Sequence, residues 1–462
     1  MKNTKSRSIV LYFILLSFFT GLGFFIYSFV KEADVWAFSS INRHLYEGSM
    51  SGGKISDCNN TILAQTVNGK RIYNEDENIR KAVLHIVGDG SVFIPTSVQS
   101  RYTAQLFGYN IVTGFGAPKI LNMNKNIKLT IDSNVCSDVS KSFKDNKGAA
   151  VAYNYLTGEL LCMVSLPTYD VNNRPDFTKN SKKYEGVYLN RAISSSYTPG
   201  SIFKIFTTIA GIDCIKDLES RKFSCNKVKV INGEKVTCMK SHGTIGLKEG
   251  FSKSCDIVFG DIGVELGKDV MKRKMEEIGF NTPQYFDGIE LAKSEYDVSK
   301  ASDADLAWSA IGQYKDKVNP MHMLKIMGAI ANQGISNEPF LVKSVSSKGS
   351  FTPFQPTKCE SKQIINPSTA DKLKEIMHYT MKNQYGDSLF PGVTMCAKTG
   401  TAEVGEGKLP HGWMVGFSYD KKFPIAFAVI VENGDFGIKS AGPIASVMIK
   451  SLHSKFLDNK FV

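Results

Sequence analysis

The sequence predicts an α+β or α/β core, in which helices cover a sheet, behind an N-terminal apolar segment. Apolar residues recur at helical spacing in "SIFKIFTTIAGI" (201–212) and "NPMHMLKIMGAIANQG" (319–334). By contrast, "GWMVGFS" (412–418) and "PIAFAVIVEN" (424–433) are continuous apolar runs, as in buried strands. Helical and strand signals that mix along one chain favour helices packed on a sheet.

The composition is that of an ordinary globular protein. The chain has 462 residues, of which 42% are hydrophobic and 22% charged, so it can form two or three domains. Its net charge of +12 suits an anionic wall polymer, a membrane surface or simply a solvated lysine-rich surface. The basic residues are scattered and lack interleaved aromatic side chains, so we expect no nucleic-acid partner.

The first element is an uncharged apolar segment, "IVLYFILLSFFTGLGFFIYSFV", at residues 9–30. Its length suits a single crossing of a bilayer. Three basic residues lie in the tail 1–8, so the N-terminus should stay in the cytoplasm and the rest should lie outside. A cleaved signal peptide is the alternative, although the apolar stretch is long for one. We therefore expect a single-pass membrane anchor.

The next segment, 31–146, has mixed character, with short strand-like runs between Gly and Asn turns. Residues 135–143 have helical spacing, and 149–165 is typical of a hairpin. A boundary near residue 147 would separate a smaller membrane-proximal domain, 31–146, from a larger domain, 147–462.

A candidate nucleophile lies in "YTPGSIFKIF", where Ser201 and Lys204 follow a turn-forming Pro199-Gly200 pair. Ser-x-x-Lys occurs five times in the chain, but only here does it open a helix-like apolar run. Free N–H groups at a helix start favour developing negative charge, and positions i and i+3 share a face. Lys204 can therefore take the proton of Ser201 if its amine is uncharged. The alternative is a capping Ser followed by a solvated Lys.

Two further motifs follow in order along the chain. "SKSCDIVF" contains S-C-D at 254–256, and "CAKTGTAEV" contains the only K-T-G of the chain, at 398–400. S-x-x-K, S-x-N and K-T-G in this order form the signature of penicillin-binding proteins and serine β-lactamases. The middle motif departs from that signature, because it reads S-x-D.

With these motifs the chain resembles the class B penicillin-binding proteins, which are membrane-anchored peptidoglycan D,D-transpeptidases. Four longer segments carry the resemblance further: "LTGELLCMVSLPTYDVN", "RAISSSYTPGSIFKIF", "IGQYKDKVNPMHMLKIMGAIANQG" and "HGWMVGFS". It covers residues 125–450 and is weak over 31–120. It implies an α+β transpeptidase fold similar to that of the serine β-lactamases, with a five-stranded sheet flanked by helices and a helical lobe beside it.

The resemblance also implies roles for single residues. Ser201 would be the nucleophile that forms the acyl-enzyme, Lys204 its general base, and Ser254 the proton relay to the leaving amine. Lys398 would supply positive charge, and the N–H groups of Ser201 and Thr401 would form the oxyanion hole. The substrate-binding positions would be Asp256, Thr399, Gly400 and Thr401.

The partners that the resemblance implies are stem peptides ending in D-Ala-D-Ala, β-lactam antibiotics that mimic this amide, and a membrane glycosyltransferase. The location would be the bacterial cell membrane, and no organic cofactor is expected. Three other functions stay open: a D,D-carboxypeptidase, in which water replaces the acceptor amine; a β-lactamase; and a non-enzymatic sensor or scaffold with a weak site.

Asp256 raises a physical objection, because the family carries a neutral Asn at this position. A carboxylate about 4 Å from Lys204 would favour the charged ammonium by ~4 kcal/mol at an effective dielectric constant near 20. A general base must instead be uncharged. A metal ion bound to the carboxylate would withdraw this charge.

One short segment, 225–256, contains residue types that bind Zn²⁺. We expect four of them to be ligands: Cys225, Cys238, His242 and Asp256. Cys255 is the alternate, because neighbouring residues of an extended segment face opposite sides. The spacing lacks a C-x-x-C pair, so a Cys225–Cys238 disulfide or unbound thiols remain as alternatives.

Overall fold

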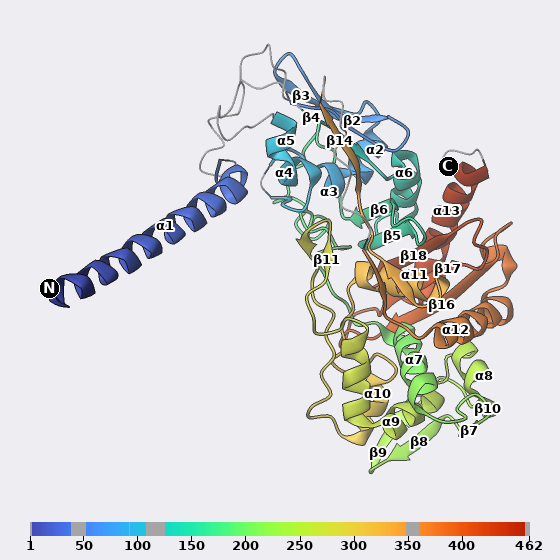
Figure 1. The fold of residues 1–462 in the computed structure, drawn as a ribbon. Helices are drawn as coiled ribbons and strands as arrows, with labels where there is room; N and C mark the ends of the chain where they lie inside the picture. Colours follow the sequence, from blue (N-terminus) through green and yellow to red (C-terminus); the bar gives the residue numbers. More distant parts are fainter. Residues whose placement is uncertain (1, 38–51, 92, 108–124, 348–359, 458–462) are drawn as a thin grey trace.

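The computed structural model describes residues 2–37, 52–91, 93–107, 125–347 and 360–457, and the statements below refer to these. Figure 1 shows helix α1 (Lys2–Ala37) extending away from the rest of the protein. Its segment Val10–Lys31 has a mean hydropathy of 2.1, and none of it is buried against other elements. The segment is long and apolar enough to cross a membrane, as the sequence predicts.

The centre of the protein is a five-stranded antiparallel sheet with the order β16-β17-β18-β5-β6. Every residue of β5, β6 and β18 is buried, because helices cover both faces. This double burial explains why the strands are continuous apolar runs rather than alternating ones. The strands are β5 (Gly148–Asn154), β6 (Leu160–Leu166), β16 (Met395–Ala402), β17 (His411–Ser418) and β18 (Ile425–Val431).

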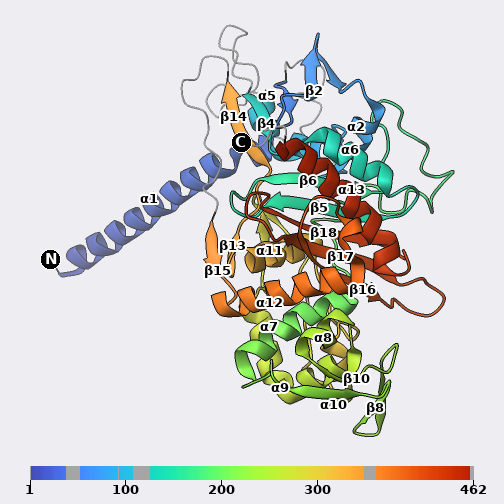
Figure 2. The same cartoon turned by 90° about the vertical axis from the view of Figure 1, so that its right-hand side faces the viewer.

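Helices α6 (Ser133–Ser142) and α13 (Gly437–Leu457) pack on one face of this sheet, and α11 (Pro320–Ala331) and α12 (Pro367–Thr380) pack on the other (Figure 2). Helix α11 begins where the sequence indicates, since the Asn319 side chain accepts two backbone N–H groups of its first turn. All its residues are buried, including the polar His322 and Lys325, and the other side chains of this helix are apolar.

A helical lobe lies beyond the edge strand β16, at the bottom of Figure 1. The nucleophile segment leads into it through the short helix η2 (Gly200–Phe203). Its helices are α7 (Lys204–Cys214), α8 (Leu247–Ser252), α9 (Asp256–Glu277) and α10 (Asp303–Ser309). Its strands are β7 (Lys222–Cys225), β8 (Val228–Ile231), β9 (Glu234–Thr237) and β10 (Gly243–Gly246).

A second five-stranded sheet, with the order β14-β4-β1-β2-β3, lies at the opposite end of the molecule. Strand β14 comes from the second part of the chain and pairs with β4, so residues on both sides of the proposed boundary at 147 build this sheet. Its strands are β1 (Ile55–Ser56), β2 (Ile62–Val67), β3 (Lys70–Tyr73), β4 (Lys125–Leu129) and β14 (Val342–Ser347). Short helices accompany it: α2 (Glu77–Ala82), α3 (Leu84–Val87), α4 (Val98–Arg101) and α5 (Thr103–Phe107).

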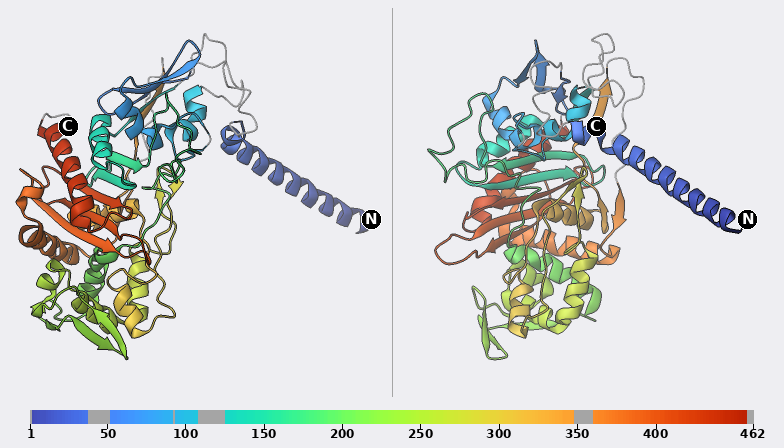
Figure 3. Two further views of the ribbon diagram at one scale, coloured as in Figure 1. Left: turned by 180° about the vertical axis from the view of Figure 1, so that it is seen from behind. Right: turned by 90° about the vertical axis from the view of Figure 1, so that its left-hand side faces the viewer.

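One cluster of buried apolar side chains continues from this small sheet through the central sheet into the helical lobe. Both views of Figure 3 show the central sheet between the other two parts. The shared core holds the edge of the central sheet against the lobe, and the site lies there. The remaining short elements are β11 (Tyr285–Phe286), β12 (Ile289–Glu290), β13 (Ile335–Asn337), β15 (Ser361–Gln363), η3 (Met381–Tyr385) and η4 (Asp387–Leu389).

Candidate active site

The three motifs meet where β16 faces the lobe. Ser201 lies in η2, Lys204 begins α7, Ser254 lies in the turn between α8 and α9, and Lys398 lies on β16. Residues almost 200 positions apart in the chain are thus neighbours, because the lobe is inserted between the strands of one sheet.

The Pro-Gly turn before the nucleophile is a requirement of close packing. Gly200 has a φ of +55°, a conformation that residues with a Cβ rarely adopt. A Cβ added there would lie 2.3 Å from the carbonyl oxygen of Thr401. Only glycine therefore allows the start of the helix to lie against β16.

Lys204 is fully buried and forms a short network with the neighbouring motifs. Its Nζ lies 2.7 Å from Ser201 Oγ and 3.1 Å from Ser254 Oγ. An uncharged amine keeps two hydrogens and one lone pair, so the same contact lets Lys204 accept the proton of Ser201. The geometry required of a nucleophile and its base is present.

Lys398 approaches the same network from the sheet. Its Nζ donates to Ser254 Oγ at 3.1 Å and to the Thr399 carbonyl oxygen at 2.7 Å. Burial lowers the pKa of Lys398 well below its usual range, the nearby Lys204 charge lowers this pKa further, and Asp256 opposes both effects. Ser254 lies between the two amines, and its φ of +54° is a strained conformation for a residue other than glycine.

Asp256 lies on the first turn of α9 with its Oδ1 2.7 Å from Lys204 Nζ. The objection raised by the sequence therefore takes a definite form: two buried lysines share one carboxylate. Burying unpaired charge is costly, so one negative charge is best balanced by one positive charge. This arrangement favours one charged and one uncharged amine beside the carboxylate, and the ion pair in the structure joins Asp256 to Lys204.

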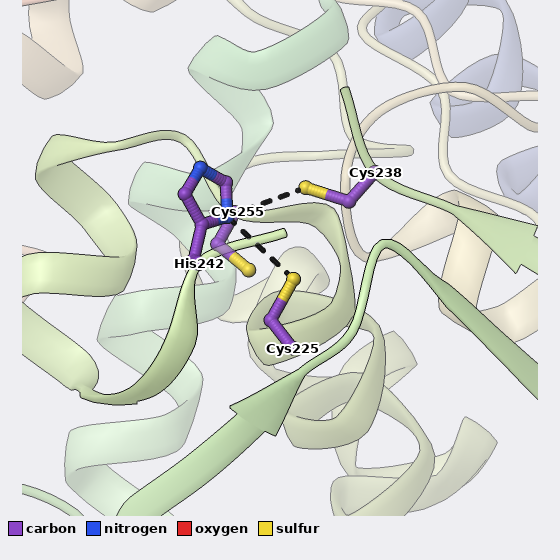
Figure 4. Close-up of side chains that lie close together, drawn as sticks. All are labelled: Cys225, Cys238, His242 and Cys255. Atoms are coloured by element: carbon purple, nitrogen blue, oxygen red, sulfur yellow. Dashed lines mark hydrogen bonds between the residues drawn. The ribbon is translucent and has the colours of Figure 1, made fainter. Parts of the chain in front are cut away.

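A second cluster lies behind this turn (Figure 4). Ligand-type atoms of four residues lie within 4.8 Å of one another: Cys225, Cys238, His242 and Cys255. The Nδ1 atom of His242 is 3.6 Å from the Sγ atoms of both Cys225 and Cys238. The four side chains come from separate places in the lobe. Cys225 ends β7, Cys238 and His242 lie in the loop between β9 and β10, and Cys255 precedes α9. Both thiols of the alternative Cys225–Cys238 disulfide are free.

The fourth ligand differs from our expectation, since the structure groups Cys255 rather than Asp256 with the other three. Ser254 and Asp256 both contact Lys204 while Cys255 joins the other cluster, but the segment is a turn that starts a helix rather than the extended stretch we expected, since Ser254 has a φ of +54° and Asp256 begins α9. The Cys225 and Cys238 thiols and the His242 ring lie next to Cys255. Asp256 reaches the cluster only through its backbone N–H, which donates to Cys238 Sγ at 3.4 Å.

Residues 148–450 match the penicillin binding protein transpeptidase domain, which is more than half of the chain. The chain belongs to this family. Its membership confirms the resemblance that the three motifs and the four longer segments indicate.

Relatives of this penicillin-binding protein include peptidoglycan D,D-transpeptidase PbpA of Mycolicibacterium smegmatis, 29% identical over 64% of this chain and 64% of the relative. PbpA of Mycobacterium tuberculosis is 30% identical over 66% of this chain and 67% of the relative. The match thus spans about two thirds of each relative. The structure of penicillin-binding protein A from M. tuberculosis has a TM-score of 0.77 at 25% identity and covers 88% of this chain and 99% of its own. This likeness confirms the predicted α+β transpeptidase fold.

Two residues that the sequence did not indicate as site residues contact strand β16, which carries the K-T-G-T motif of this penicillin-binding protein. Gln313 Nε2 donates to the Thr401 carbonyl oxygen at 3.2 Å. The Tyr385 hydroxyl lies 2.9 Å from Thr399 Oγ1 and accepts the Thr399 N–H at 3.0 Å. Gln313 lies in the quoted "IGQYKDK" segment, but no sequence pattern points to Tyr385, because a helix end and not a motif brings it to β16.

Proposed function

We propose that this chain is a serine D,D-transpeptidase that cross-links peptidoglycan stem peptides through an acyl-enzyme on Ser201. The observation that carries the proposal is the contact of Lys204 Nζ with Ser201 Oγ at 2.7 Å, beside a hydroxyl that touches both lysines. The relatives support it, because they are named as peptidoglycan D,D-transpeptidases. Penicillin-binding protein A from M. tuberculosis, 25% identical, forms a penicillin G acyl-enzyme.

In the acylation step, Ser201 Oγ attacks the carbonyl carbon of the D-Ala-D-Ala amide. The new bond forms between Oγ and carbon, and the proton of Ser201 moves to the uncharged amine of Lys204. The oxygen that becomes negative would be held by the N–H groups of Ser201 and Thr401, a contribution of ~3 kcal/mol per donor in related chemistry.

Collapse of this intermediate breaks the carbon–nitrogen bond, and the departing D-Ala amine needs a proton. Ser254 is suited to pass it, because its hydroxyl contacts both Lys204 and Lys398. The product is an ester on Ser201. An amine of a neighbouring stem peptide then attacks the ester carbonyl and loses its proton as Ser201 regains one. With water in place of this amine, the same site would act as a D,D-carboxypeptidase.

The substrate's terminal carboxylate would lie beside the K-T-G-T strand. Lys398 brings positive charge to this place, and Thr399 and Thr401 bring hydroxyl groups on the same side of β16. Gly400 lies between them, where an added Cβ would come within 2.8 Å of the Pro199 carbonyl oxygen. Asp256 would not contact the carboxylate directly, because two carboxylates repel each other and Asp256 Oδ1 is held by Lys204.

We infer a single-pass topology in the bacterial cell membrane, with the N-terminus in the cytoplasm and both sheets outside. The apolar segment and the basic residues before it support this orientation. A transpeptidase held at the membrane acts on glycan strands as they are made there. A membrane glycosyltransferase is therefore the partner that we propose.

Labelling of full-length protein in detergent with a fluorescent penicillin tests the proposed function. We expect a covalent adduct in the wild type and none in Ser201→Ala. Ser224→Ala is the matched control, because Ser224 also precedes a Lys by three residues but is exposed in the lobe. If the wild type is not labelled, a non-enzymatic scaffold becomes the favoured function. If the adduct forms but is hydrolysed within seconds, a β-lactamase is favoured.

We further infer that Cys225, Cys238, His242 and Cys255 bind Zn²⁺. Zinc bonds of about 2.3 Å to sulfur and 2.0–2.1 Å to nitrogen place tetrahedral ligands roughly 3.5–3.8 Å apart. The two separations of 3.6 Å in the cluster fit this geometry. Three cysteines and one histidine form a closed set, as in structural zinc sites. Such a site would hold the turn that carries Ser254 and Asp256, rather than withdraw charge from Asp256.

Metal analysis of the full-length protein, purified without added metal, tests this site. We expect about one zinc per chain, its loss in Cys255→Ser, and a lower melting temperature after chelation. Cys214→Ser is the control, because Cys214 is exposed and lies outside the cluster. Zinc-free protein whose melting does not respond to a chelator would leave the four side chains as unbound thiols and imidazole.

A further inference from the structure

Strand β16 is the outer strand of the central sheet, so alternate residues turn their backbone groups away from β17. Thr399 and Thr401 are two such residues, and protein side chains already occupy part of this edge. The Thr401 carbonyl oxygen accepts from Gln313, and the Thr399 N–H donates to Tyr385. Tyr385 thus takes a backbone donor on the strand that would bind the substrate.

Tyr385 reaches β16 because of an irregularity in its helix. Residues Met381–Tyr385 form a π-helical turn that extends α12, and Gly386, with a φ of +77°, then leads the chain away. Such turns are frequent at functional sites, since they redirect side chains at the end of a regular helix. Here the turn directs the phenol of Tyr385 against Thr399.

The hydrogen bonds of this phenol have a defined direction. A backbone N–H can only donate, so the Tyr385 oxygen accepts from the Thr399 N–H. Burial raises the pKa of Tyr385, so the phenol keeps its own hydrogen. Among the described residues, Thr399 Oγ1, at 2.9 Å, is the acceptor available to that hydrogen.

The direction at Thr399 follows from this constraint. If the threonine hydroxyl donated to Tyr385, the hydrogen of this half-buried phenol would have no acceptor among the described residues. If Tyr385 donates to Thr399, both groups are satisfied and the hydroxyl hydrogen of Thr399 is left to point elsewhere. A carboxylate can only accept hydrogen bonds, so it needs a threonine in this second state.

We propose that Tyr385 is a positioning residue, which orients the Thr399 hydroxyl as a donor to the carboxylate of the substrate or of a β-lactam. The proposal rests on the proposed function, in which Thr399 binds that carboxylate. Tyr385 itself does not touch the substrate. Its hydroxyl therefore matters only for ligands that carry the negative charge.

The test compares acylation of the full-length protein by penicillin G and by its uncharged methyl ester. In the wild type, the ratio of the two second-order rate constants measures what the carboxylate contributes. Tyr385→Phe keeps the ring and removes the hydroxyl, and we expect this ratio to fall roughly tenfold, the scale of one hydrogen bond to a charged group. Tyr379→Phe is the control, since Tyr379 lies on α12 beside Lys248, and should keep the ratio.

A double-mutant cycle separates positioning from packing. In a Thr399→Val background, Tyr385→Phe should change the ratio less than twofold, because the hydroxyl it orients is absent. An unchanged ratio in Tyr385→Phe, an equal fall with both ligands, or full additivity with Thr399→Val would each overturn the proposal.

A second comparison does not depend on the folding of the Tyr385 variant. Thr399→Ser keeps the acceptor for Tyr385 and should retain the ratio, whereas Thr399→Val should lose it. Equal ratios in these two variants would overturn the proposal. Failure of the proposed function looks different, because the wild type would then form no adduct on Ser201 with either ligand.

Discussion

Replacing Gly200 by alanine tests whether the close approach of the nucleophile's turn to β16 builds the site. The added Cβ would lie 2.3 Å from the Thr401 carbonyl oxygen, whereas real Cβ contacts are essentially never under 3.0 Å. The turn and the strand edge must therefore separate by about 0.7 Å, the difference between these two distances. The N–H groups of Ser201 and Thr401, which we propose as the oxyanion donors, lie on the two parts that separate.

The expected losses in stability and in acylation rate of Gly200→Ala come from two separate effects. The left-handed conformation costs alanine about 1–2 kcal/mol of folding stability. Misplacing an oxyanion donor costs about 3–4 kcal/mol in the transition state, or roughly a hundredfold or more in rate. We therefore expect acylation by penicillin G to slow about a hundredfold, while the protein remains folded.

The assay is the time course of adduct formation in full-length protein, followed together with thermal melting. Gly233→Ala is the matched control: Gly233 has a φ of +90° and nothing lies within 4 Å of an added Cβ. It imposes backbone strain without a clash and should keep the acylation rate. Acylation of Gly200→Ala within threefold of the wild type, or an equal loss in Gly233→Ala, would refute this reasoning.

Three further predictions concern charge and buried hydrogen bonds. Asp256→Asn removes a carboxylate oxygen 2.7 Å from Lys204 Nζ, a contact worth up to ~6 kcal/mol in favour of the ammonium form of Lys204 at a dielectric constant of 20. Acylation by penicillin G at neutral pH should therefore become faster. A slower reaction would mean that the carboxylate mainly holds Lys204 in place. Burial raises the pKa of Asp316 from 3.8 to about 8, so the folded protein binds the extra proton between these values and its stability falls as the pH rises through that window; Asp316→Asn should flatten this dependence and melt higher than the wild type at pH 8. Trp413→Phe removes a buried N–H that donates to the Thr198 carbonyl oxygen at 3.0 Å, and chemical denaturation should give a loss of about 1–3 kcal/mol; an unchanged midpoint would mean that the strand repacks around the smaller ring.

The fold class was accessible from sequence because the relevant signals are local. Continuous apolar runs such as 412–418 and 424–433 are strands in the structure, and the periodic segment 319–334 contains a helix. Strand β14 had no such signal, since its pairing with β4 joins residues about 200 positions apart. Pairing across that distance depends on where two completed parts of the fold meet, and no short pattern encodes it.

The amino-acid sequence by itself determined the chemistry of this protein: a serine one turn before a lysine, a second serine, and a second lysine beside two threonines, in an order that its family shares. Tertiary structure alone decided which neighbour each group faces. It directed Cys255, rather than Asp256, to the other three metal-ligand candidates, and it brought Tyr385 to Thr399. The physical reason is that each residue type carries its own chemical group, which the sequence specifies directly. The direction in which that group points depends on the turn or helix end that carries it, and this forms only when the chain folds.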